Sequence, residues 1–323
     1  MKTDGEHEVI PEAELLRQAA DWLAGRMLDA SDLRHLAQER GLDFATAVLY
    51  QALRRSPQHG PLIASLEESG TPVPALDAEI VIVPGGFYKE NPATGAAGHL
   101  VTESARRLGF ATVMVPLHSF GTVAENARLL ADWLRQRRDR PMILVSHSKG
   151  ATEIRQLLAR PDAAELFGGV RAWIDLSGLF LGTPLIGWLG THPIRRQFVR
   201  LSFWWKGFAF AALDEIDKGA CPAWPGALDA VPWMDVIHVI GFPLQRHLST
   251  PLMRRGHRRL APLGPSDGTV LLEDVFSLPG RVYPVFGADH YLRPANRDMI
   301  QLMSRMLAYL ADRTTAHPAK ELV

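Results

Sequence analysis

Three side chains in this chain have the types and the order needed to activate a serine. Ser148 lies in the pentapeptide Ser-His-Ser-Lys-Gly at 146–150, between an apolar run at 142–145 and a helical pattern at 151–159. A strand, a tight turn and a helix in that order expose a serine Oγ above the carboxyl edge of a sheet, where it can attack an acyl carbon. We therefore predict that Ser148 is a nucleophile.

The pentapeptide departs from the pattern G-x-S-x-G at its first position. Ser146 replaces the first glycine, whereas Gly150 keeps the last one. A sharp turn needs small residues at both flanks, because a bulky side chain would collide with the neighbouring strand or helix. A five-residue match alone is more often an ordinary strand-to-helix connection, so the prediction depends on partners elsewhere in the chain.

Two later segments supply an acid and a base. Arg281–Phe286 has the pattern of a short strand, and His290 follows it, in a position to take a proton from the serine. Asp267 lies in a turn rich in proline and glycine at 264–270, which leaves its carboxylate free to orient a histidine. Asp175, at the end of an earlier strand-like run, is the alternative acid.

Over residues 79–312, the Asp-Gly-x-Val turn and the Gly-x-Asp-His segment resemble those of the lipase-like α/β-hydrolases. The resemblance implies a mostly parallel sheet with helices on both faces. It also implies that Ser148 forms an acyl-enzyme, that His290 is the general base and that Asp267 stabilises the imidazolium.

The same resemblance implies an oxyanion hole made of backbone N–H groups. A strand pattern at 78–83 is broken by a Pro-Gly-Gly-Phe-Tyr turn, where Pro84 has no N–H to donate. By position, the donors are Gly86 or Phe87, together with Lys149. The residues that we expect in the substrate pocket are Tyr88, His118, Trp204 and Trp205.

The apolar pattern divides the chain into four parts. A helical N-terminal extension covers 1–78, and the α/β-hydrolase core covers 79–182 and 263–323, interrupted by an insertion at 183–262. Crossover helices are expected at 97–108 and 123–137. Within the extension, Ser31 and Asp32 predict the cap of its second helix, and a linker is expected at 70–74.

The insertion is rich in aromatic residues, and in the resembled family a segment at this place forms a helical lid. Its tryptophans are Trp188, Trp204, Trp205, Trp224 and Trp233. We expect most of these rings to hold the lid helices together. Residues 198–213 predict an amphipathic or apolar helix that can touch a lipid surface transiently. The arginine-rich segment 254–259 predicts either an anion-binding site or a solvated basic turn.

The composition limits the function classes. The formal net charge is zero, which gives no indication of a nucleic-acid partner. Cys221 is the only cysteine, and the histidines lack the spacing of metal ligands, so we expect neither an internal disulfide nor a metal or cofactor. No apolar run is long enough to span a bilayer, and the acidic start lacks a signal core, so we expect a cytoplasmic protein.

These observations predict a serine hydrolase that cleaves a small carboxylic ester with a hydrophobic acyl or alcohol part. A thioesterase, an amidase or an acyltransferase/cyclase would use the same triad. A non-catalytic binding protein with this fold is the other alternative, and the oligomeric state stays open.

Overall fold

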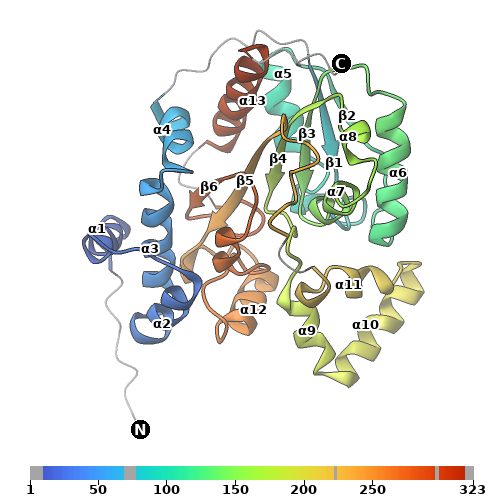
Figure 1. Cartoon of the computed structure of the whole chain (residues 1–323). Helices are drawn as coiled ribbons and strands as arrows, with labels where there is room; N and C mark the ends of the chain where they lie inside the picture. The colour runs from blue at the N-terminus through green and yellow to red at the C-terminus, as the bar shows by residue number, and fades with distance from the viewer. Residues whose placement is uncertain (1–9, 69–77, 222–223, 295–297, 317–323) are drawn as a thin grey trace.

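A parallel sheet of six strands, in the order β2-β1-β3-β4-β5-β6, forms the centre of the described part of the chain (Figure 1). The structure is a computed structural model that describes residues 10–68, 78–221, 224–294 and 298–316. The linker expected at 70–74 lies outside these residues. The strands are β1 (Glu79–Val83), β2 (Thr112–Met114), β3 (Met142–His147), β4 (Val170–Leu176), β5 (Asp235–Phe242) and β6 (Arg281–Phe286).

Helices cover both faces of the sheet because the strands carry apolar side chains on both sides. In β1, Ile80 and Ile82 belong to one core cluster, and Val81 and Val83 belong to the other. The first cluster is covered by α3 (Leu42–Arg55), α4 (Gly60–Glu68), α5 (His99–Arg107) and α13 (Met299–Ala316). The second is covered by α6 (Val123–Arg135), α7 (Gly150–Leu158) and α8 (Ala163–Leu166).

The order in which the strands are laid down reverses between β1 and β3. From β1 the chain crosses to β2 on one side and then returns to β3 on the other, so that the segments after β1 and β3 leave toward opposite faces. Ligands of open α/β sheets bind at such a switch point, outside the carboxyl ends of the strands. The turn that contains Gly86 and the turn that contains Ser148 follow these two strands.

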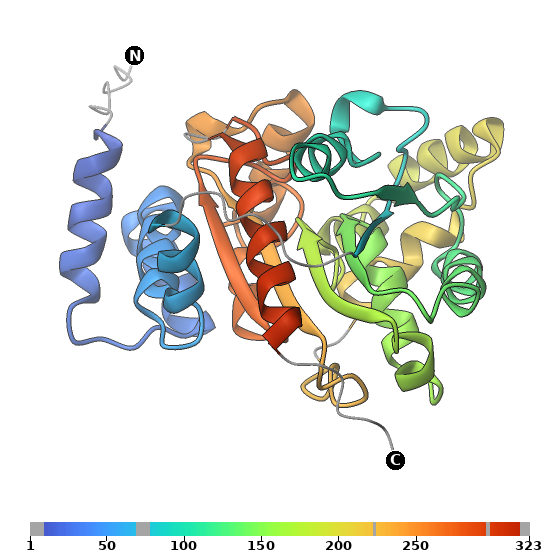
Figure 2. The same ribbon diagram turned by 90° about the horizontal axis from the view of Figure 1, so that it is seen from above.

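The N-terminal extension packs beside β6, as Figure 2 shows from above. It begins with α1 (Glu12–Leu23) and α2 (Ala30–Arg40) and continues into α3 and α4. On α3, the Tyr50 ring lies 5.0 Å from that of Phe286. The N-cap of α2 is Asp29, two residues before the predicted Ser31, and it exchanges hydrogen bonds with Asp32, the other residue of the predicted cap.

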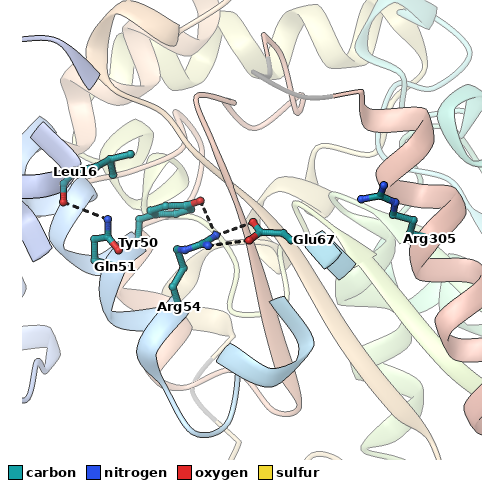
Figure 3. A pocket seen from close by; sticks show the side chains of 6 residues that line it. All are labelled: Leu16, Tyr50, Gln51, Arg54, Glu67 and Arg305. Atoms are coloured by element: carbon teal, nitrogen blue, oxygen red, sulfur yellow. Dashed lines mark hydrogen bonds and ion pairs between the residues drawn. The ribbon is translucent and has the colours of Figure 1, made fainter. Parts of the chain in front are cut away.

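The extension also forms a pocket of about 620 Å³ with α13, drawn in Figure 3. Arg54 makes a two-pronged ion pair with Glu67 there, with both N···O distances below 3 Å, and Arg305 reaches toward them from α13. The polar groups of Arg54 and Glu67 thus satisfy one another, and Ser148 is not among the residues that line this pocket.

A strand of the sheet lies inside the segment expected as one continuous insertion at 183–262, and that expectation was wrong in this respect. The segment between β4 and β5 carries α9 (Pro184–Gly190), α10 (Pro193–Lys206) and α11 (Ala211–Glu215). The chain then returns to the sheet as β5, and α12 (Pro251–Leu260) follows it. In Figure 1 the three helices (yellow-green to yellow) lie below α7, and α9 lies beside α12.

The amphipathic helix expected at 198–213 is two helices. Gly207 ends α10 because it adopts a left-handed backbone with φ of 71°, the usual stop at a helix C-terminus. In the described part of the chain, no helix is both long enough and apolar enough to cross a membrane.

Candidate active site

Ser148 lies on a strained turn between β3 and α7, as the sequence predicts. Its φ is +50°, a left-handed value that is unfavourable for a residue with a side chain. The loop after β4 holds the turn, because Ser148 N–H donates to Leu176 O and Leu179 N–H donates to Ser148 O. A methyl group at Gly150 would stand 2.8 Å from Val83 O, so only glycine lets α7 begin this close to β1.

Three segments far apart in the sequence meet at Ser148. Ser148 Oγ lies 3.1 Å from His290 Nε2, and His290 Nδ1 lies 2.9 Å from Asp267 Oδ2. The buried Asp267 is fixed by the N–H groups of Thr269 and Val270, which donate to its Oδ1. Because the carboxylate accepts from Nδ1, Nε2 is left to accept the serine proton. In this arrangement the carboxylate orients the histidine ring, and the ring nitrogen lies within hydrogen-bond distance of the serine hydroxyl.

Asp175, the alternative acid, belongs to a different network. Its Oδ1 accepts from Ser146 Oγ at 2.7 Å, and its Oδ2 lies 2.9 Å from His238 Nδ1. Ser146 also accepts a hydrogen bond from Trp173 Nε1. The serine that replaces the first glycine of the pentapeptide thus links β3 to β4 and, through Asp175, to β5, in a network that does not include His290.

Two backbone N–H groups are available beside Ser148. Among the described residues, the N–H groups of Gly86 and Lys149 have no hydrogen-bond acceptor. Both residues line the pocket over Ser148. Phe87 N–H instead donates to Ser119 O at 2.9 Å, so the expectation of Phe87 as a donor does not fit the structure.

A buried ion pair fixes the Lys149 side chain, and sequence reasoning missed it. Lys149 Nζ pairs with the Glu153 carboxylate one helical turn later, and Asn126 Nδ2 donates to Glu153 Oε1 at 2.8 Å. Burial raises the pKa of Glu153 above its usual value, against the lowering effect of Lys149. The i, i+4 spacing of a lysine and a glutamate on one helix was the available signal.

The pocket over Ser148 has a volume of about 480 Å³. None of the four expected pocket residues lines it. Tyr88 is buried and donates to Leu117 O instead, and His118 is exposed. Trp204 and Trp205 are 75% and 82% exposed on the outer side of α10. The apolar lining comes instead from Phe87, Phe120, Leu179, Ile186, Phe208 and Leu213.

Aromatic packing joins the inserted helices to the Gly86 turn. The Phe87 ring stacks on the Phe120 ring at 4.1 Å, and Phe203 and Phe208 contact both rings edge-on or tilted. The inner face of α10 therefore contributes to the same apolar cluster as the turn beside Ser148. Phe203, Phe208 and Phe210 thus hold the inserted helices in place as predicted, whereas Phe198, Trp204, Trp205 and Trp233 are exposed and do not.

His147 stays neutral beside the site. Burial, reinforced by the nearby His290, lowers the pKa of His147 to about 3. An uncharged ring at this position adds no cation that would oppose protonation of His290. Asp289, the neighbour of His290, accepts from Ser249 and Tyr291, which is a turn role rather than a catalytic one.

No family model and no curated protein sequence matches the chain. The structure is similar to that of a metagenomic carboxyl esterase, with a TM-score of 0.53 and 18% identity over 75% of this chain and 76% of that chain. It is similar to the mature form of the Bacillus licheniformis lipase BlEst2, with a TM-score of 0.53 and 19% identity over 78% of this chain and 95% of that chain. The chain has the α/β-hydrolase fold.

Proposed function

We propose that this chain is a serine hydrolase that cleaves carboxylic esters with a hydrophobic acyl part. The observation that carries the proposal is the alignment of Ser148 Oγ, His290 and Asp267, with separations of 3.1 Å and 2.9 Å, at a largely apolar pocket. The similarity to a carboxyl esterase and a lipase supports the same class.

The proposed reaction follows from these groups. Ser148 Oγ attacks the ester carbonyl while His290 Nε2 takes the serine proton, and Asp267 stabilises the imidazolium. The N–H groups of Gly86 and Lys149 stabilise the negative oxygen of the tetrahedral intermediate. His290 then protonates the leaving alcohol as the carbon–oxygen bond breaks. Water, deprotonated by His290, attacks the acyl-enzyme and releases the carboxylic acid and Ser148.

The pocket supports an ester with an apolar acyl group. Its lining includes Phe120, Leu179 and Leu213 beside the oxyanion donors, where the acyl group of a bound ester would lie. Thioesters and amides are cleaved by the same chemistry. A series of esters with increasing acyl length measures how long an acyl group the pocket accepts.

Transient contact of α10 with a lipid surface is part of the proposal. Ile194, Phe198, Leu201 and Trp205 are exposed and follow the spacing of four, three and four residues that places them on one face. Exposed cations, namely Arg195, Arg200 and Lys206, flank this stripe. Two copies of the chain paired through the stripe would bring these cations together, whereas an anionic lipid surface complements them.

The test is covalent labelling with a fluorophosphonate, mapped by peptide mass, followed by hydrolysis of p-nitrophenyl esters of increasing acyl length. We expect labelling at Ser148, turnover of the esters, and loss of both in Ser148→Ala. Retained hydrolysis by folded Ser148→Ala contradicts the proposal. Absence of labelling in the folded wild type favours the binding-protein alternative.

A further inference from the structure

Four arginines gather beside the Ser148 pocket without a carboxylate to balance them, and one of them, Arg259, lines the pocket. Arg255, Arg258 and Arg259 lie on α12, and Arg195 comes from α10. Among the described residues, none of the four has an ion-pair partner. Burial lowers the pKa of Arg259. The positive charges of Arg195, Arg255 and Arg258 lower this pKa further, because they repel the Arg259 guanidinium.

Trp188 brings the two helices together at this point. The guanidinium carbon of Arg259 lies 3.8 Å from the centre of the Trp188 ring, and that of Arg195 lies 5.4 Å from it. Two cations from different helices therefore converge on one indole. Arg258 and Arg259 lie in the last turn of α12, where the helix dipole stabilises positive charge. The dipole of α12 does not account for Arg195, because that residue belongs to α10.

The cluster adjoins the catalytic pocket. Arg259 lines that pocket together with Leu252 and Gly256, which share its face of α12. The helix lies against the turn of the predicted acid, since a methyl group at Gly256 would stand 1.9 Å from Gly268 O. An anion held by these arginines would thus belong to a molecule that also reaches Ser148.

We propose that the arginine cluster Arg195, Arg255, Arg258 and Arg259 binds a phosphate group on the alcohol part of the ester. This inference rests on the proposed function. The alcohol oxygen leaves from the side of His290, which protonates it, and α12 flanks the turn that positions His290. A phosphate has up to two negative charges and several acceptor oxygens, which suits several guanidinium groups better than a single carboxylate does.

Two soluble substrates that differ only in the phosphate test the proposal. They are 1-butanoylglycerol and 1-butanoylglycerol 3-phosphate, and the readout is the ratio of their kcat/KM values. We expect the wild type to prefer the phosphorylated ester by about tenfold or more, which is the size of one or two charge-assisted hydrogen bonds. The preference should shrink as salt rises, because the arginines are partly exposed.

Substitutions locate the effect. Arg259→Gln and the double variant Arg255→Gln/Arg259→Gln should lower the ratio about tenfold or more, and Arg259→Lys should lower it less because the charge remains. Arg137→Gln is the matched control, because Arg137 also stacks on a tryptophan, Trp133, at 4.1 Å, beyond the end of α6. An equal loss of the ratio in Arg137→Gln contradicts the assignment.

A long-chain pair distinguishes a lipid headgroup from a soluble phosphate ester. If the preference appears only for 1-oleoylglycerol 3-phosphate in phosphatidylcholine vesicles, the phosphate belongs to a lipid. A preference with the short pair assigns it to a soluble ester. No preference with either pair, in a protein that hydrolyses both neutral esters, overturns the phosphate site and leaves the proposed function intact.

Binding tests the site even if no ester is hydrolysed. Isothermal titration of glycerol 3-phosphate into the wild type should show binding that Arg259→Gln weakens and Arg137→Gln retains. Such binding without Ser148 labelling or turnover would refute the proposed function and keep the phosphate site. Absence of binding, together with a ratio near one, refutes the site.

Discussion

The assignment of the acid makes a strong prediction for Asp267→Asn. Thr269 and Val270 donate N–H groups to Asp267 Oδ1 at 2.7 Å and 2.8 Å. In the variant, these donors select the amide oxygen at that position and so turn the amide NH₂ toward His290 Nδ1. The ring must then accept at Nδ1 and carry its proton on Nε2, where it cannot take the proton of Ser148.

The size of the effect follows from the lost charge. A carboxylate 2.9 Å from an imidazolium nitrogen stabilises it by about 6 kcal/mol at an effective dielectric constant of about 20. That energy corresponds to a fall in kcat of about 10⁴-fold, similar to the loss when the triad aspartate of a serine protease becomes asparagine.

The assay compares Asp267→Asn with Asp175→Asn, using hydrolysis of p-nitrophenyl butanoate and the rate of fluorophosphonate labelling. Asp175 pairs with Ser146 and His238, so its variant should lose stability but retain kcat within about tenfold. Circular dichroism establishes that both variants are folded. If Asp175→Asn loses more activity than Asp267→Asn, the acid is Asp175 and the reasoning from the Thr269 and Val270 donors is refuted.

Two further predictions concern the lipid contact and the stability. The double variant Trp204→Ser/Trp205→Ser should sediment less with anionic vesicles than the wild type does. Its thermal midpoint should stay within a few degrees of the wild-type value, because both rings are largely exposed. Undiminished vesicle binding would exclude α10 as the contact. Burial raises the pKa of Asp274 from 3.8 to about 6, against the opposing effect of Lys218. The folded state therefore favours the protonated carboxyl. As the pH rises from about 4 to about 6, the unfolded chain releases this proton more readily than the folded protein does, so the free energy of unfolding falls. Across that range, the unfolding free energy of Asp274→Asn should gain up to roughly 3 kcal/mol relative to the wild type in denaturant titrations; a constant difference would contradict the raised pKa.

Local sequence was enough to predict the strands and helices around Ser148. The strand-turn-helix pattern predicts β3, the Ser148 turn and α7 because apolar periodicity and small residues act over a few positions. β5 was not predicted, since its apolar run follows a tryptophan-rich segment and a buried strand has no alternating pattern. Only pairing with β4 and β6 shows that it belongs to the sheet.

The lining of the site depended on orientations that sequence does not contain. Trp204 and Trp205 were expected in the pocket from their residue type, yet Phe203 occupies the inward face of α10 and turns them outward. Phe87 was also predicted as a possible oxyanion donor, but in the structure its N–H donates a hydrogen bond to Ser119 O.

The sequence by itself determined the types and the order of Ser148, Asp267 and His290, because the turns that carry them depend on nearby residues. Only the tertiary structure decided which carboxylate faces His290 and which arginines meet at Trp188. Those contacts join segments that are distant in the chain, and their geometry is set by the packing of the sheet and its helices.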